Sequence, residues 1–83
     1  MSFNLDGRLV YAGGECRDRE TRTTFDEVKA YNPDTDSWAT LPNMPTGLHA
    51  GAAVALDGVA YVIGGTHGCG GDRLSEEVVT LSF

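Results

Sequence analysis

Apolar residues fall in short runs along the chain, and glycine, proline or clusters of polar residues separate these runs. Such runs are typical of β-strands, and no stretch shows the spacing of an amphipathic helix. The pattern predicts six strands, over residues 8–12, 27–31, 38–41, 50–56, 59–63 and 77–81. A polar loop is expected over residues 15–24. The sequence therefore predicts an all-β fold.

A repeat is the second feature of the chain. Five residues recur 51 positions later, since Leu5, Asp6, Gly7, Gly13 and Gly14 return as Leu56, Asp57, Gly58, Gly64 and Gly65. A fixed period of about fifty residues indicates a repeat architecture, in which each unit buries its apolar face against its neighbours and roughly three or more units are needed. The 83 residues hold fewer units than that. We therefore expect copies of the chain, the rest of a longer polypeptide or a second chain to complete the core.

Three linked features then point to a known family. The residues Tyr-Val-Ile-Gly-Gly at 61–65 close a strand on a diglycine, and Tyr31 precedes Trp38 with six residues between them. The segment Leu-Pro-Asn-Met-Pro-Thr at 41–46 is similar to the linker between kelch blades. On these residues nearly the whole chain resembles the kelch repeat. The resemblance implies a β-propeller built from four-stranded, antiparallel blades.

The resemblance also assigns the expected strands to blades. Residues 1–41 would supply strands two to four of one blade, and residues 42–83 strands one to three of the next. The innermost strand of the first blade and the outermost strand of the second would then be absent. Open strand edges recruit further strands, so we expect a homo-oligomer or a piece of a longer chain. Small residues at 51–55 suit the innermost strand, which lies nearest the crowded axis.

Several residues are assigned structural roles. The diglycines Gly13-Gly14 and Gly64-Gly65 allow backbone angles that other residues avoid. The kelch pattern implies that Tyr31 and Trp38 pack between blades, so both are expected in the core. The alternative for Trp38 is a binding role, if lost neighbours leave its ring exposed.

Candidate ligand-binding residues come from the loops that join strands two and three and from the linker between blades. In a propeller these segments lie at the same end, where many propellers collect their function. The residues expected there are Arg17, Arg19, His49, His67, Asp72 and Arg73. Kelch linkers often carry arginine where this chain has Leu48, so we expect a less polar inner rim here.

The sequence predicts no catalytic residues, no metal and no cofactor. The glycine-rich run 64–71 lacks the Lys-Ser/Thr pair and the helix that follow a phosphate loop. His67 and Cys69 are too close together for the usual zinc pair. Cys16 and Cys69 are expected to be free thiols in loops, with a disulfide or a shared metal as the alternatives. Ser75 has His67 nearby in sequence, but closeness in sequence does not orient a nucleophile.

Charge limits the classes of partner. Twelve acidic and six basic residues leave a net charge of −6, which disfavours nucleic acid and anionic membrane surfaces. No apolar run approaches the length of a membrane span, and the first ten residues do not read as a signal peptide, which favours the cytoplasm. The sequence thus predicts a non-catalytic protein-interaction module. The alternative that the resemblance implies is part of a carbohydrate-active kelch enzyme, similar to sialic acid mutarotases or galactose oxidase-like oxidoreductases.

Overall fold

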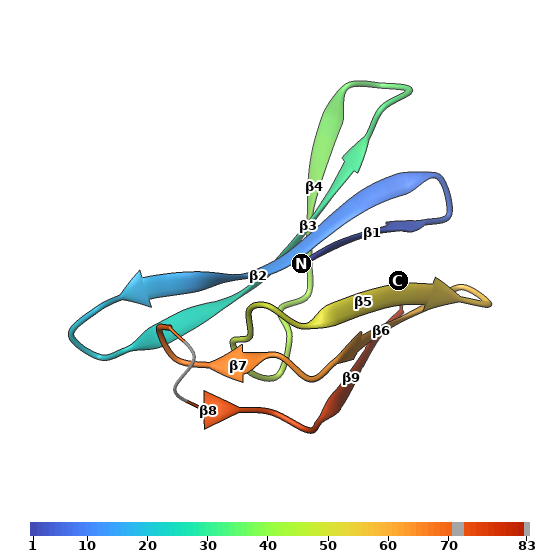
Figure 1. Ribbon diagram of the computed structural model, residues 1–83. Helices are drawn as coiled ribbons and strands as arrows, with labels where there is room; N and C mark the ends of the chain where they lie inside the picture. The colour runs from blue at the N-terminus through green and yellow to red at the C-terminus, as the bar shows by residue number, and fades with distance from the viewer. Residues whose placement is uncertain (71–72, 83) are drawn as a thin grey trace.

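The computed structural model describes residues 1–70 and 73–82, and these contain nine strands and no helix (Figure 1). The prediction of an all-β fold is confirmed. The first sheet has four antiparallel strands in chain order, namely β1 (Ser2–Leu5), β2 (Arg8–Asp18), β3 (Thr23–Asn32) and β4 (Ser37–Leu41). With no helix in the described residues, no described segment forms a helix that could cross a membrane.

Two smaller sheets follow. The second sheet has the order β5-β6-β9, formed by β5 (Ala52–Leu56), β6 (Val59–Ile63) and β9 (Val78–Leu81). The third is a short antiparallel pair, formed by β7 (Thr66–His67) and β8 (Arg73–Leu74). All six expected strands are present, β6 with the expected bounds and the others with shifted ends, and the count of six is wrong because the structure adds β1, β7 and β8. β5 begins at Ala52 because Ala50 leaves the extended conformation, with a φ of 61°.

The missed strand β1 follows from a hairpin turn. Asp6 and Gly7 have φ angles of 52° and 80°, and Asp57 and Gly58 have nearly the same angles, 51° and 78°. Two consecutive positive φ angles are those of the tight turn whose twist matches a β-hairpin. The first turn therefore pairs β1 with β2 just as the second pairs β5 with β6. The expectation of only three strands in residues 1–41, with an open edge beside β2, is wrong because β1 covers that edge.

Much of the loop expected at residues 15–24 is strand. β2 continues to Asp18 and β3 starts at Thr23, so the two form an extended hairpin arm. The pairing register shifts between Ala12 and Gly14, where the diglycine makes a bulge before the arm begins. We call residues 14–25 the arm. It projects from the first sheet toward the same side as the β7–β8 pair (Figure 1).

The core lies between the two larger sheets. Side chains alternate across a strand, so every second residue faces the partner sheet. The buried apolar residues from the first sheet are Phe3, Leu5, Val10, Ala12, Val28 and Ala30, and those from the second are Ala60, Val62, Val79 and Leu81. β1 lies against β5, where the small side chains of Ala53 and Ala55 pack against this core.

The linker at residues 42–48 closes this core at the end where the arm begins. Met44 and Leu48 are buried, and their amides donate to the carbonyl oxygens of Asp26, at 2.8 Å, and Phe25, at 3.3 Å. The Leu48 carbonyl in turn accepts from the Gly14 amide at 3.2 Å. A buried Leu48 has its polar backbone groups satisfied, which a segment crossing a core requires.

Tyr31 and Trp38 do not belong to the core between the two sheets of this chain, and their expected packing between blades stays a prediction. The Trp38 side chain is 64% exposed, and Tyr31 opposite it is only partly covered. Strand alternation directs both rings to the outer face of the first sheet, away from the second sheet. Their ring centroids lie 5.2 Å apart. The Tyr31 hydroxyl donates to Asp36 at 2.8 Å, and this bond raises the pKa of Tyr31 above its ordinary value.

The two glycines Gly13 and Gly7 provide a matched test of the packing at the linker. Both have positive φ angles, 75° and 80°, so alanine is strained at either position. A side chain at Gly13 would also collide with the Leu48 carbonyl, whereas nothing lies within 4 Å of one at Gly7. We expect Gly7→Ala to lower the free energy of unfolding by about 1 kcal/mol and Gly13→Ala by about 3 kcal/mol. Urea unfolding measures both, and equal losses would contradict the close packing.

Candidate recognition surface

Three segments meet at one end of the molecule, which we call the loop end. They are the arm, the linker at 42–48 and the β7–β8 pair. A bridge joins the linker to β7, since the His49 amide donates to the Thr66 carbonyl at 3.1 Å and the Thr66 amide donates to the His49 carbonyl at 2.9 Å. The bridge thereby holds the residue after the linker next to β7.

The His49 side chain is engaged within this bridge. Its Nε2–H donates to the Gly68 carbonyl at 3.0 Å, and the Thr66 hydroxyl donates to the Gly70 carbonyl at 3.2 Å. Thr66 is buried and also contacts the His49 ring. These bonds give His49 a role in ordering the segment after β7.

His67 and Arg73 line one cavity of about 220 Å³ at the loop end. The other residues of its wall are Thr23, Thr24, Thr46, Gly47 and Gly68. His67 Nδ1 lies 3.3 Å from both Thr46 Oγ1 and the Gly47 carbonyl oxygen, so a proton on Nδ1 can be donated to either. Glu77 Oε1 is 3.9 Å from His67 Nε2. The cavity therefore combines a guanidinium, an imidazole and hydroxyl groups.

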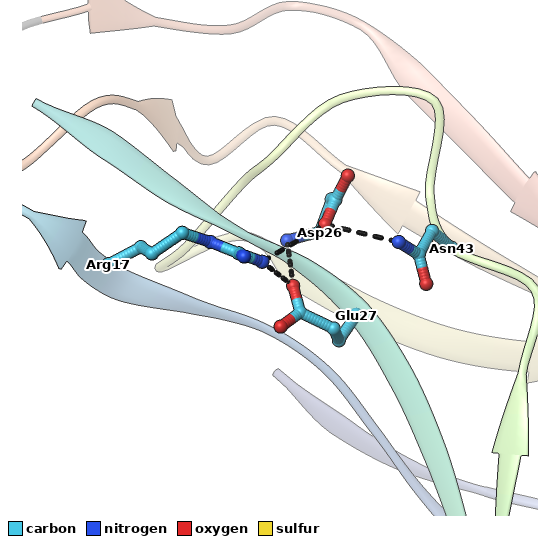
Figure 2. Close-up of polar contacts among 4 residues, drawn as sticks. All are labelled: Arg17, Asp26, Glu27 and Asn43. Carbon is cyan, nitrogen blue, oxygen red and sulfur yellow. Dashed lines mark hydrogen bonds and ion pairs between the residues drawn. The ribbon is translucent and has the colours of Figure 1, made fainter. Parts of the chain in front are cut away.

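Arg17 lies on the arm in a small polar cluster (Figure 2). Its guanidinium forms ion pairs with Glu27 and, at 3.3 Å, with Asp26, and it stacks 5.0 Å from the centre of the Phe25 ring. Asn43 of the linker donates to Asp26 at 3.3 Å. The side chains of Arg17, Asp26 and Glu27 are 35–46% exposed, so each ion pair contributes less than about 1 kcal/mol. The cluster joins the arm to the linker.

Cys16 and Cys69 form a disulfide, with their Cα atoms 4.9 Å apart. The expectation of two free thiols is wrong, because the arm and the segment after β7 run close enough for the two side chains to meet. The disulfide lies in the wall of a second cavity, of about 420 Å³, together with Glu15, Arg19, Arg22 and Gly70. Among residues 1–70 and 73–82, no group of three or more potential metal ligands is assembled.

The structure thus brings together some of the expected binding residues and separates others. His67 and Arg73 share one cavity, Arg19 lies in the other, and Arg17 and His49 are held by contacts within the chain. Asp72 lies outside the described residues. Sequence reasoning missed the threonines of the first cavity and Arg22 of the second. Threonine on a polar strand carries no signal of binding, because its position in space depends on how the arm and linker pack.

Comparison with known proteins adds relatives of two kinds. Kelch-like protein 33 of Homo sapiens is 39% identical over 66 residues, which cover 80% of this chain and 12% of that protein. An N-acetylneuraminate epimerase of Shigella boydii serotype 4 (strain Sb227) is 38% identical over 65 residues, which cover 76% of this chain and 18% of that protein. No family model matches the chain.

A solved structure of YjhT is also similar, with a TM-score of 0.67 and 35% identity over 81% of this chain and 20% of that one. The fold is therefore that of kelch-type β-propeller blades. The chain belongs to the kelch repeat family. It spans about a fifth or less of the length of each of the three proteins named above.

Proposed function

We propose that the chain is part of a kelch propeller that acts as a non-catalytic protein-interaction module, with the loop end as its recognition surface. The cavity of about 220 Å³ carries this proposal, because side chains from three separate segments converge on it. Thr24 comes from β3, Thr46 from the linker, and His67 and Arg73 from the β7–β8 pair. Loops held by a rigid sheet scaffold are where binding residues concentrate.

The chemistry of this cavity suits a polypeptide partner. The Arg73 guanidinium can donate two parallel hydrogen bonds to a carboxylate. Threonine hydroxyls can both donate hydrogen bonds to peptide groups and accept them. The kelch-like relatives support this class of function, which the family resemblance implies. In this proposal residues 1–41 form one blade with all four strands, and residues 42–83 form the first three strands of the next.

Arg73 and Arg8 provide a matched pair for testing the recognition surface. Arg73 lines the cavity, whereas Arg8 starts β2 at the opposite end, beside the Asp6-Gly7 turn. An arginine at the centre of an interface contributes roughly 2 kcal/mol or more, so Arg73→Ala should reduce capture of a specific partner by about tenfold or more. Arg8→Ala should leave capture unchanged. Proteins retained on the immobilised chain, quantified by mass spectrometry, measure this. Equal retention by both variants would contradict the proposal.

A carbohydrate-active function is the second candidate. The relative named N-acetylneuraminate epimerase favours it, together with an arginine and a histidine in one cavity, since a guanidinium can pair with a sugar carboxylate. One measurement distinguishes the two functions. Proton NMR gives the rate at which the forms of N-acetylneuraminate interconvert, with and without the chain. Our proposal expects no change in rate. A rate increase that disappears in Arg73→Ala would favour the enzyme.

We also propose that the outer faces of the two sheets are contact faces for further blades, supplied by copies of the chain or by a longer polypeptide. Leu9, Tyr11 and Trp38 lie exposed on the outer face of the first sheet. Val54, Ile63 and Val78 lie exposed on the outer face of the second. Patches of this kind on opposite sides of a molecule favour head-to-tail contacts, which close into rings.

Variants at Trp38 and Leu74 test whether the outer face makes a specific contact or whether any exposed apolar side chain has the same effect. Leu74 on β8 is 83% exposed and lies on neither outer face, whereas Trp38 is 64% exposed on one of them. We expect the wild-type chain to self-associate, Trp38→Ser to weaken this association by about tenfold or more, and Leu74→Ser to leave it unchanged. Light scattering over a range of concentrations gives the molar mass. A folded wild-type monomer at every concentration would contradict contact between copies of the chain on these faces.

A further inference from the structure

At the loop end, the Cys16–Cys69 disulfide joins the first sheet to the segment that follows β7. It connects β2 to the segment after β7, across 53 positions of sequence, and the chain has no other cysteines. One end of the bond lies on the arm, and the other lies beside the cavity that holds His67 and Arg73. The bond therefore links the scaffold of the first blade to a wall of the proposed recognition surface.

The β7–β8 pair has little stability of its own. Each strand has two residues, and the pair matches Thr66 with Leu74 and His67 with Arg73. Isolated two-stranded pairs are at best marginally stable in water. The pair is anchored at its base by the bridge between His49 and Thr66. Farther along, hydrogen bonds hold Gly68 to His49 and His67 to the linker, and the disulfide ties the segment covalently to the arm.

Other contacts near the disulfide depend on the same approach of the two segments. Arg22 donates to the Cys69 carbonyl at 2.9 Å. A side chain at Gly68 would come within 3.0 Å of the Arg22 carbonyl oxygen and 2.9 Å of the Arg73 guanidinium. These contacts involve Gly68 and Cys69, so they form where the disulfide holds the arm close to the segment after β7.

The disulfide is also placed for attack by an external thiol. Cys69 is buried, but Cys16 is partly exposed, and the bond lies in the wall of the cavity of about 420 Å³. Arg19 and Arg22 line this cavity, with Glu15 as the acidic side chain in the same wall. Guanidinium groups near a sulfur stabilise the thiolate that forms when a disulfide is cleaved.

We propose that the Cys16–Cys69 disulfide is a redox-controlled clamp on the recognition surface. A thiolate of a small dithiol attacks one sulfur, forms a mixed disulfide and releases the other cysteine as a thiolate, which takes up a proton. The second thiol of the reductant then displaces the remaining cysteine, and the reductant leaves as its own disulfide. Two electrons and two protons pass from the dithiol to the cysteine pair, so the exchange balances.

Reduction releases the β7–β8 pair from the arm. Hydrogen bonds to His49 and to the linker then hold Gly68 and His67 without the covalent tie to the arm, so the wall of the cavity of about 220 Å³ becomes less fixed relative to Thr23 and Thr24. This inference rests on the proposed function for its consequence, namely that partner binding differs between the oxidised and reduced chains. The movement of the β7–β8 pair itself can be measured without any partner.

Amide hydrogen exchange of the full chain tests the clamp. The oxidised wild type is compared with the wild type in dithiothreitol, whose reduction is verified as a mass gain of two hydrogens, and with the variant C16S/C69S. We expect the amides of the β7–β8 pair to exchange about tenfold faster or more in the reduced wild type and in C16S/C69S than in the oxidised wild type. Amides at the centre of β6 should change by less than about twofold, because they belong to the core between the sheets.

Arg17→Ala serves as the matched control, because it removes the ion pairs of the arm and keeps the disulfide. We expect it to leave exchange of the β7–β8 pair unchanged. Three results would each overturn the proposal: unchanged exchange of the pair after reduction, equal acceleration in β6, which would show global unfolding, or resistance of the bond to dithiothreitol in the folded chain. Partner capture by the Arg73→Ala variant is a separate measurement, so the clamp and the proposed function can fail independently.

Discussion

Each of the two larger sheets carries apolar side chains on both faces, and the chain covers only one face of each. The inner faces meet across Val10, Val28 and Val62, which are fully buried. The outer faces carry exposed aromatic and branched side chains such as Trp38 and Val54. Burial of apolar surface is the main favourable term in folding, so a sheet of this composition is stable only between two neighbours. The repeat in the sequence and the packing of the two sheets against each other both follow from this requirement.

The Asp-Gly turns show how far the sequence predicts this architecture. The turn at Asp57-Gly58 predicts a hairpin because its residues accept positive φ angles. The same dipeptide stands at Asp6-Gly7, 51 positions earlier, and adopts the same angles. The pattern of apolar runs does not predict the strand before Asp6-Gly7, because the segment 2–5 has only four residues and is polar at alternate positions. The repeat itself contained the missing information. The turn at Asp57-Gly58 follows a strand, so the corresponding turn at Asp6-Gly7 also requires a strand before it.

The loop end was predictable in position but not in detail. Blade topology places His67, Arg73 and Arg19 at one end, because the connections that hold them lie on the same side of the sheets. The sequence could not predict that Cys16 and Cys69 come within bonding distance, since this depends on β2 and β3 continuing into an arm. It also could not predict that Thr24 and Thr46 face one cavity. Such contacts are set by the packing of segments far apart in sequence.

The two ends of the molecule are held together by different forces. Beside β1 and β5 the sheets share an apolar core, which no change in redox state alters. At the loop end the exposed ion pairs of Arg17 each contribute less than about 1 kcal/mol, and backbone hydrogen bonds such as that of Leu48 contribute about 1 kcal/mol each. A disulfide that closes a loop of this length contributes roughly 4 kcal/mol in the chain-entropy account. The disulfide is therefore the largest single contribution at the loop end, beside many hydrogen bonds of about 1 kcal/mol each, whereas the core between the sheets does not depend on it.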